Sequence, residues 1–489
     1  MILEKIYGFM EKYSDKTTSL LINNKKSTFI LASILTVAVA VILSYFSRDG
    51  FRLFPAIMIS LFLILIYSNI LNASKNYKKA ITFVFILSFL FQIYLAAQFI
   101  GVEHDINNRR SEGETIDKAG NIYREVNPYY TPLIYGKITP YFKSEEEIQE
   151  YNKRADYYYP PTRAWTAFLA LKLSELTSIK FSTMIKMPMI LTTFLIGILL
   201  YKIMIFYKKG PKEIYKTMAF YLFNPLTIMV SGYHGQDDNL GIIFLVLFFY
   251  YLLKSQKINF FSALLLGLSL VVKPVAAPVL PYFVSKQKKL LKMAMFGIIV
   301  IFPYLFLIAT YPYSPLFEKL KGTLLYGGVK YLWGYSRVEN YFTTSFNLPG
   351  LHTSFSYVYP AITILLFGGM FLYFLKNKRI NYLDGIIISN LFFFVFTSGF
   401  GLQYFMWMLP FAVLKANEHK FRYFYYIFSI LSGLMALVFY YGNANTYYFI
   451  RDAIGYSIIG ITLWIFIIFW WAWYLKIGVN EKPKQLPTQ

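Results

Sequence analysis

The chain has 489 residues, of which 57% are hydrophobic, 20% are aromatic and only 15% are charged, and its formal net charge is +23. A soluble protein of this size needs more polar surface to cover its core, so the composition argues against a water-soluble protein. Cysteine is absent, which excludes disulfide bonds and thiolate metal sites.

Apolar runs of about 20 residues recur along nearly the whole chain, the length needed to cross the apolar layer of a bilayer. We therefore expect an all-α fold, a polytopic transmembrane helical bundle formed as one domain over residues 1–489. The first run, 28–46, is longer than the apolar core of a signal peptide, and no small-residue cleavage site follows it. We interpret it as the first span.

Basic residues cluster in alternate short connections, as expected for cytoplasmic loops. With both termini cytoplasmic, these clusters share one side if about 13 spans cross the membrane. The predicted spans are 28–46, 52–72, 79–101, 182–206, 216–232, 239–253, 260–285, 290–310, 357–375, 385–399, 404–415, 423–441 and 454–475. All basic clusters fall on that side only if 260–285 is two half-helices that are broken at Lys273-Pro274. A break there is expected, because proline removes a helix donor. The positive charge is thus topological and does not indicate nucleic acid.

The opposite side of the membrane receives the other polar segments. They include two long extracytoplasmic loops, 102–160 and 311–356, and the turn at 399–403. Long loops in a compact membrane protein are usually functional or disordered. Tyrosine-rich stretches and the Pro160-Pro161 pair, which favours a helix start, predict short interfacial helices in these loops.

Acidic residues stand where the third span ends, in the sequence Glu103-His104-Asp105. A solvated helix end is the simplest explanation of this group. The alternative is a general base, because desolvation at the membrane boundary raises the pKa of a carboxyl group and makes it a better base. Either Glu103 or Asp105 could be that base.

The motif HGQDDN, residues 234–239, separates two apolar runs. Asp237 or Asp238 could cap the following helix, because an aspartate at a helix start accepts backbone N–H bonds. Two aspartates beside His234 and Gln236 exceed what a cap needs, so we also predict binding of a hydroxylated or cationic ligand. Oxygen ligands of this kind suit a divalent cation as well. The spacing specifies no metal, and the sequence requires no cofactor.

Three further polar residues are candidates on the same face. Lys273 is the most isolated charge of the chain; it either extends its ammonium group to the interface or binds an anion such as a phosphate. Arg337 could provide a second phosphate contact or be an ordinary loop arginine, and Gln403 is a similar polar point.

Taken in order, these motifs resemble those of the GT-C glycosyltransferases, in particular the prokaryotic branch that depends on polyprenyl-phosphate-mannose. The motifs that carry the resemblance span about residues 100–412. They are Asp105 after an early span, G-x-x-I with GNIY (Gly113, Ile116 and 120–123), YPP (159–161), G-Q-x-D (235–238), Lys273-Pro274 and QYxxWxxPF (403–411). The two spans before residue 79 and the second acid, Glu103, depart from the family pattern.

The resemblance implies inverting transfer of a hexose, with mannose preferred, from a polyprenyl-phosphate donor to an acceptor hydroxyl. Asp105 would be the general base, and Lys273 with Arg337 would stabilise the leaving phosphate. Gln236 and Asp238 would hold sugar hydroxyls or orient the base. The acceptor, a glycan, lipid or protein, stays open. The enzyme would build cell-envelope glycan at the outer face of a prokaryotic cytoplasmic membrane.

Other classes of function fit parts of the sequence. A transporter or flippase for lipid-linked glycans also needs broken helices. It predicts charges at the bilayer midplane and two halves of the chain that are related in sequence, and no such internal repeat is visible. A polymerase of lipid-linked glycans would differ from the glycosyltransferase described above only in its donor. A scaffolding protein would leave the clustered polar residues without a reason.

Overall fold

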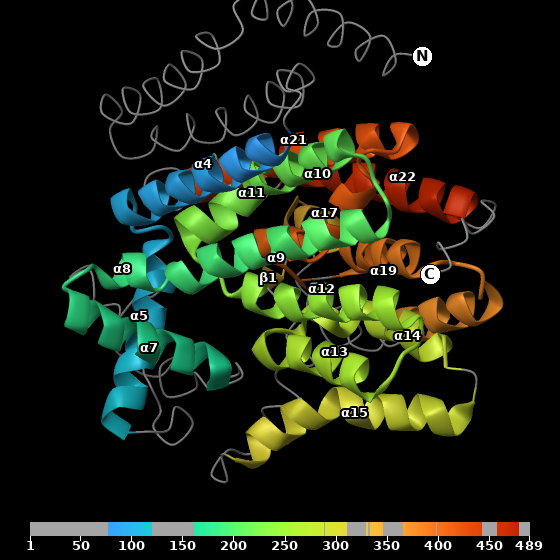
Figure 1. Cartoon of the computed structure of the whole chain (residues 1–489), viewed down its shortest axis with the longest axis horizontal. Helices are drawn as coiled ribbons and strands as arrows, with labels where there is room; N and C mark the ends of the chain where they lie inside the picture. Colours follow the sequence, from blue (N-terminus) through green and yellow to red (C-terminus); the bar gives the residue numbers. More distant parts are fainter. Residues whose placement is uncertain are drawn as a thin grey trace, which may run out of the picture.

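The computed structural model describes residues 77–119, 161–287, 289–310, 329–330, 333–345, 365–397, 399–442 and 457–478. The predicted spans 28–46 and 52–72 lie outside the described residues. So do residues 120–160 of the first long loop and most of the second. Figure 1 shows the described helices running roughly side by side, with α5 and α7 beyond one end of α9 and α12.

The described part is all-helical apart from one short antiparallel pair, β1 (Val329–Lys330) with β2 (Gly399–Phe400). The helices in chain order are α4 (Tyr77–Gln98), α5 (Glu103–Ala119), α7 (Pro161–Thr177), α8 (Phe181–Met184), α9 (Met187–Phe206), α10 (Pro211–Leu222), α11 (Pro225–Ile228), η3 (Met229–His234), α12 (Asp238–Ser255), α13 (Phe260–Val272), η4 (Pro274–Val279), α14 (Leu280–Ser285), α15 (Leu290–Ala309), α17 (Gly334–Ser345), α19 (Tyr382–Phe396), η5 (Leu402–Trp407), α20 (Leu409–Lys415), α21 (His419–Gly442) and α22 (Ile461–Gly478).

Six helical segments of the described part are long and apolar enough to cross a membrane, as the hydropathy pattern predicts. They are Tyr77–Gln98, Phe181–Phe206, Asp238–Ser255, Leu290–Leu307, Phe421–Tyr440 and Ser457–Lys476. Shorter apolar helices lie at Phe260–Val272, Pro274–Ser285, Leu365–Lys376 and Tyr382–Phe396. The chain is therefore a helical membrane protein.

The predicted break at Lys273 is confirmed. Helix α13 ends at Val272, and Lys273 adopts an extended backbone with φ −153° and ψ 157° before the 3-10 helix η4 begins at Pro274. The predicted span 216–232 is also interrupted, which we did not expect. There, α10 ends at Leu222, and the side chain of Asn224 accepts a hydrogen bond from Leu226 N, which starts the short helix α11. Proline and asparagine residues thus divide two apolar runs into half-helices.

Side-chain contacts define two ends of the bundle. At the first, called here the motif end because residues 234–239 lie there, Asn239 Nδ2 donates to Thr193 Oγ1 at 2.7 Å, so α9 and α12 start together. At the other, called the basic end, Asn417 Nδ2 donates to the carbonyl of Glu213 at 3.1 Å, next to the start of α10. Lys286 Nζ donates to the carbonyl of Ile380 at this same end.

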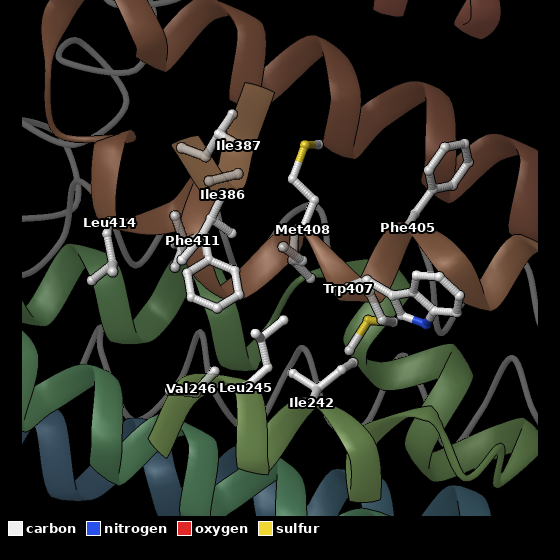
Figure 2. Close-up of a cluster of buried hydrophobic side chains, with 14 of the residues drawn as sticks. Ile242, Leu245, Val246, Ile386, Ile387, Phe405, Trp407, Met408, Phe411 and Leu414 are labelled. Atoms are coloured by element: carbon white, nitrogen blue, oxygen red, sulfur yellow. The ribbon is translucent and has the colours of Figure 1, made fainter. Parts of the chain in front are cut away.

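The core between the two ends is built from apolar faces of helices that are distant in sequence. Figure 2 shows α12 facing η5, α20 and α19. Fully or almost fully buried side chains fill this contact, namely Ile242, Leu245, Val246, Ile386, Ile387, Phe405, Trp407, Met408, Phe411 and Leu414. This packing holds the start of α12 next to Trp407, at the motif end.

The first long loop, 102–160, begins with 17 residues of regular helix, α5, and not with irregular chain. Helix α7 begins at Pro161 as predicted and packs on α5. A Cβ atom at Gly113 would lie 2.9 Å from the carbonyl oxygen of Ala167, so the two helices approach closely only because this residue is glycine. The buried pair Arg163–Glu112, at 3.0 Å, fixes their relative orientation.

The outer face of α7 carries a row of exposed apolar side chains, a pattern typical of helices that lie along a membrane surface. They recur at helical spacing and are Trp165, Leu169, Leu173 and Leu176. The predicted interfacial helix after Pro160-Pro161 therefore has the required apolar face.

Candidate functional site

The position of Asp105 depends on Gly101, in the turn between α4 and α5. Gly101 has φ +94°, and a Cβ atom there would lie 2.6 Å from the carbonyl oxygen of Tyr233. Only glycine lets this turn approach η3 so closely. As a result Asp105, in the first turn of α5, places its Oδ2 atom 2.6 Å from Nε2 of His234.

A π-helical turn presents the other half of the site. The backbone nitrogens of Gly235 and Gln236 both donate to the carbonyl of Val230, at 2.9 and 3.1 Å, and Gly235 has φ +75°. π-helical turns are frequent at functional sites. This turn directs His234 and Gln236 toward the same carboxylate, and Gln236 Nε2 donates to Asp105 Oδ2 at 3.0 Å.

Lys273 connects Gln236 to the acidic pair. Its Nζ atom donates to Gln236 Oε1 at 3.1 Å and to Asp238 Oδ2 at 2.6 Å, and it lies 3.2 Å from Asp237 Oδ1. Because lysine only donates, the bond to Oε1 fixes the Gln236 amide with its nitrogen facing Asp105. The break in the 260–285 segment thus places an ammonium group against Gln236, which donates to the partly exposed carboxylate of Asp105.

The aspartates do not cap α12 as considered from the sequence. Asp237 occupies the N-cap position, but its side chain makes no capping hydrogen bond. Instead Asp237 Oδ2 accepts from Arg109 Nη1 at 2.8 Å, and Asp238 Oδ1 accepts from Trp407 Nε1 at 2.7 Å. Ion pairing is favoured over capping because a buried carboxylate gains more from a charged donor than from a backbone N–H.

The electrostatics of Asp237 follow from these partners. Burial alone would raise the pKa of its carboxyl group, but the positive charges of Lys273, Arg109 and Arg163 outweigh burial and hold the pKa well below its ordinary range. Asp237 is therefore ionised at neutral pH and part of a fixed charge network.

Exposure separates the residues of this site into two groups. The Asp105 side chain is 33% exposed, whereas the side chains of His234, Lys273 and Asp238 are 3%, 7% and 0% exposed. One accessible carboxylate thus stands in front of a buried layer of hydrogen-bonded charges. Such a carboxylate can accept a proton from a bound hydroxyl, provided that the hydroxyl comes within hydrogen-bond reach.

Six of the predicted site residues are in this network: Asp105, His234, Gln236, Asp237, Asp238 and Lys273. Glu103 is exposed on the first turn of α5. Arg337 lies on α17, where its Nη2 atom donates to Ser457 Oγ at 2.9 Å, and Gln403 is partly buried on η5. Substrate-binding roles for Arg337 and Gln403 stay predictions.

Sequence reasoning missed three partners of the network. Arg109 follows Asp105 by one helical turn, a spacing that would have indicated it had α5 been predicted as a helix. Trp407 is the tryptophan of the QYxxWxxPF motif, so its position was known but its contact with Asp238 was not. Tyr440, whose hydroxyl lies 2.9 Å from His234 Nδ1, belongs to an aromatic helix with no distinguishing signal.

The donor set can be compared with what a divalent cation requires. No group of three or more histidine and acidic side chains suited to a metal occurs among the residues that the structure describes. Asp237 and Asp238 direct their carboxylates at Lys273, Arg109 and Trp407. A role for a divalent cation stays a prediction.

Comparison with known proteins gives no relative, since no family model, no curated protein and no solved structure matches the chain.

Proposed function

We propose that the chain is an inverting membrane glycosyltransferase that moves a hexose, with mannose preferred, from a polyprenyl-phosphate sugar to an acceptor hydroxyl. The observation that carries the proposal is the exposed carboxylate of Asp105, held 2.6 Å from buried His234 in front of the Lys273 ion-pair network. The proposal includes a GT-C-like bundle of about 13 spans in a prokaryotic cytoplasmic membrane, with cytoplasmic termini and an extracytoplasmic motif end.

In the proposed reaction the acceptor oxygen attacks the anomeric carbon of the donor sugar. The bond from that carbon to the phosphate oxygen breaks, and the electron pair leaves with the lipid phosphate. Asp105 takes the proton of the acceptor hydroxyl. Its position on the first turn of α5, partly exposed, suits this role, because a base must be reached by substrate.

Stabilisation of the leaving phosphate needs a cation whose charge is available in the transition state. Lys273 is paired with Asp237 and Asp238, so we propose that it exchanges one carboxylate partner for the phosphate when the donor binds. Arg109 is a second candidate. Its buried Nη2 atom has no hydrogen-bond partner in the part of the chain that the structure describes.

The membrane-surface face of α7 supports a lipid-linked substrate. Helix α7 packs on α5, which carries Asp105, and its apolar row from Trp165 to Leu176 faces outward. A helix lying at this depth would bring the base to the level of the lipid headgroups, where the phosphate of a polyprenyl donor lies.

A transporter of lipid-linked glycans is the second candidate. It is favoured by the two discontinuous segments, which break at Lys273 and at Asn224, because transporters often bind substrate at broken helices. A polymerase of lipid-linked glycans shares the chemistry of the first candidate and differs in using a pyrophosphate-linked donor.

The test is purified full-length protein in lipid nanodiscs, incubated with polyprenyl-phosphate and polyprenyl-pyrophosphate sugars and a lipid extract as acceptor source. We expect a new glycosidic product from a monophosphate donor. Product from pyrophosphate donors alone would assign a polymerase. The same protein in sealed vesicles tests the second candidate: movement of intact lipid-linked sugar from one leaflet to the other, without any new glycosidic bond, would assign a transporter.

The matched variants are Asp105→Asn and Asp117→Asn. Both residues lie on α5 with similarly exposed side chains, at 33% and 39%, but Asp117 pairs with Lys172 on α7, away from the site. We expect Asp105→Asn to lower transfer by a factor of about 10³ and Asp117→Asn to keep it within about twofold. Equal activities of the two variants would remove Asp105 from the proposed role.

A further inference from the structure

His234 lies between two polar groups that come from opposite parts of the chain. Its Nε2 atom is 2.6 Å from Asp105 Oδ2, on α5, and its Nδ1 atom is 2.9 Å from the hydroxyl of Tyr440, near the end of α21. The His234 and Tyr440 residues are each only 3% exposed. Asp105 is thus the accessible end of a three-residue chain whose other two members are buried.

The chemistry of the three groups fixes the direction of the hydrogen bonds. An ionised carboxylate only accepts, so Nε2 of His234 must carry the ring proton and donate it to Asp105. In the neutral imidazole ring Nδ1 then has a lone pair and accepts from the Tyr440 hydroxyl. The Gln236 amide nitrogen lies 2.8 Å from Nε2 and 3.0 Å from Asp105 Oδ2, and because both nitrogens are donors, both bond to the carboxylate.

We propose that Tyr440 and His234 are positioning residues that keep the Asp105 carboxylate ionised and oriented toward the acceptor hydroxyl. This inference rests on the proposed function of Asp105 as the base. Asp105 sets the tautomer of His234, Tyr440 supports it by donating to Nδ1, and His234 in turn donates a hydrogen bond to Asp105. Hydrogen bonds to the ionised form of an acid favour that form, so the chain maintains the base ready for use.

A purely structural role for Tyr440 predicts something different. Its ring makes edge contacts with His234 and Tyr233, at centroid distances of 5.1 and 5.3 Å, and those contacts need only the aromatic ring. Tyr440→Phe keeps the ring and removes the hydroxyl. The variant therefore separates packing from the hydrogen bond to Nδ1.

The charged groups around Asp105 are unchanged in such a variant, so a change in pH dependence can be assigned to the chain. They include Glu103 and Arg109 on α5, Asp237 and Asp238 at the start of α12, Lys273 behind Gln236, and buried Lys186, which packs against Gly235 and donates to the carbonyl of Phe99.

The first experiment does not depend on activity. The chain has 4 histidines, so solid-state ¹⁵N NMR of histidine-labelled protein, with His234→Gln to assign the signal, reports the tautomer of His234. We expect a protonated Nε2 and an unprotonated Nδ1 in the wild type, and a shifted Nδ1 signal in Tyr440→Phe because the hydrogen bond from the hydroxyl is lost. A proton on Nδ1 in the wild type would overturn the proposal.

The second experiment measures steady-state transfer and uses Tyr425→Phe as the matched control. Tyr425 is another buried tyrosine of α21, but its hydroxyl donates to the Phe220 carbonyl at 2.6 Å, away from Asp105. We expect Tyr440→Phe to lower kcat about 10-fold with little change in the donor KM, and to move the acidic limb of the pH profile upward. Tyr425→Phe should match the wild type in kcat and in the position of the acidic limb.

His234→Gln retains an N–H donor near the position of Nε2, whereas His234→Leu does not, so the glutamine variant should keep several times more activity. Identical kinetics of Tyr440→Phe and Tyr425→Phe, or of the two His234 variants, would overturn the proposal. If the expected tautomer is found but no donor supports transfer, the proposed function fails and the hydrogen-bonded chain stands.

Discussion

Two buried charged clusters lie at opposite ends of the helix bundle. The site cluster, at the motif end, joins Asp105, His234, Gln236, Asp237, Asp238 and Lys273. The basic-end cluster consists of Asp384, Lys415, Glu418 and Tyr474. In the second cluster Lys415 Nζ lies 3.0 Å from Asp384 Oδ1, to which the Tyr474 hydroxyl also donates at 2.5 Å.

The two clusters use their charges differently. At the basic end Asp384 lies in the first turn of α19, beside its capping residue Asn381, and its carboxylate has fixed protein partners. Such an arrangement ties α19, α20 and α22 together. In the site cluster Asp105 is one-third exposed, and the neighbouring Arg109 keeps a buried Nη2 atom without a hydrogen-bond partner in the described residues. Incomplete satisfaction of this kind is costly for stability and typical of sites that bind a ligand.

The largest expected effect comes from removing the central lysine of each cluster. Lys273→Met leaves Asp237 and Asp238 without their shared cation, and we expect a stability loss of about 3–5 kcal/mol together with loss of transfer. Lys415→Met leaves Asp384 its Tyr474 partner, so we expect about 2 kcal/mol and normal transfer per folded molecule. Unfolding in detergent measures the stability loss of each variant, and an assay of the folded fraction measures its transfer activity. Normal transfer by Lys273→Met would mean that the site cluster, like the basic-end cluster, serves stability alone.

A smaller change removes one neutral donor from a buried aspartate in each cluster. Trp407→Phe deletes the bond to Asp238, and Tyr474→Phe deletes the bond to Asp384. We expect each to lose about 1.5–3 kcal/mol, because each acceptor is charged. Only Trp407→Phe should also lower transfer, since Asp238 positions Lys273. Parallel kinetics in the two variants would mean that Asp238 serves stability alone.

How far the sequence predicts this fold depends on the element. The break at Lys273-Pro274 was predictable, because proline interrupts an apolar run and charge parity required a turn there. The helix α5 was not, because its polar sequence lacks the apolar periodicity of an isolated amphipathic helix; packing of Gly113 against α7 stabilises it.

In the site, too, some features could be predicted from the sequence and others could not. The HGQDDN motif marked His234, Gln236 and both aspartates, because polar residues between apolar runs need an explanation. The pairing of the aspartates with Lys273 and Arg109 could not be read from the sequence, since it depends on helices meeting in three dimensions. For that reason capping, a local interaction, was the natural but wrong expectation for Asp237.

A pH titration tests the fixed charge of Asp237. The pKa of its carboxyl group is lowered in the folded protein by Lys273, Arg109 and Arg163 against the opposing effect of burial. Stability from this group is therefore complete above the unfolded value of about 4 and is lost as pH falls below it. We expect the stability advantage of wild type over Asp237→Asn to shrink by about 1–2 kcal/mol between about pH 6 and pH 3. A constant difference would mean that Asp237 is not an ionised partner.

The smallest expected effect concerns Glu103, the alternative base. Glu103 is exposed on the same first turn of α5 as Asp105, but it is Asp105 that accepts hydrogen bonds from His234 and Gln236. A solvated carboxylate of this kind contributes little to stability, so Glu103→Gln should change the free energy of unfolding by less than about 0.5 kcal/mol. Transfer should stay within about twofold, because the buried donors orient Asp105 alone. Strong loss of transfer in Glu103→Gln, with a pH profile that loses its acidic limb, would shift the base to Glu103. The network behind Asp105 would then be a support for the α4–α5 turn, comparable to the cluster at the basic end.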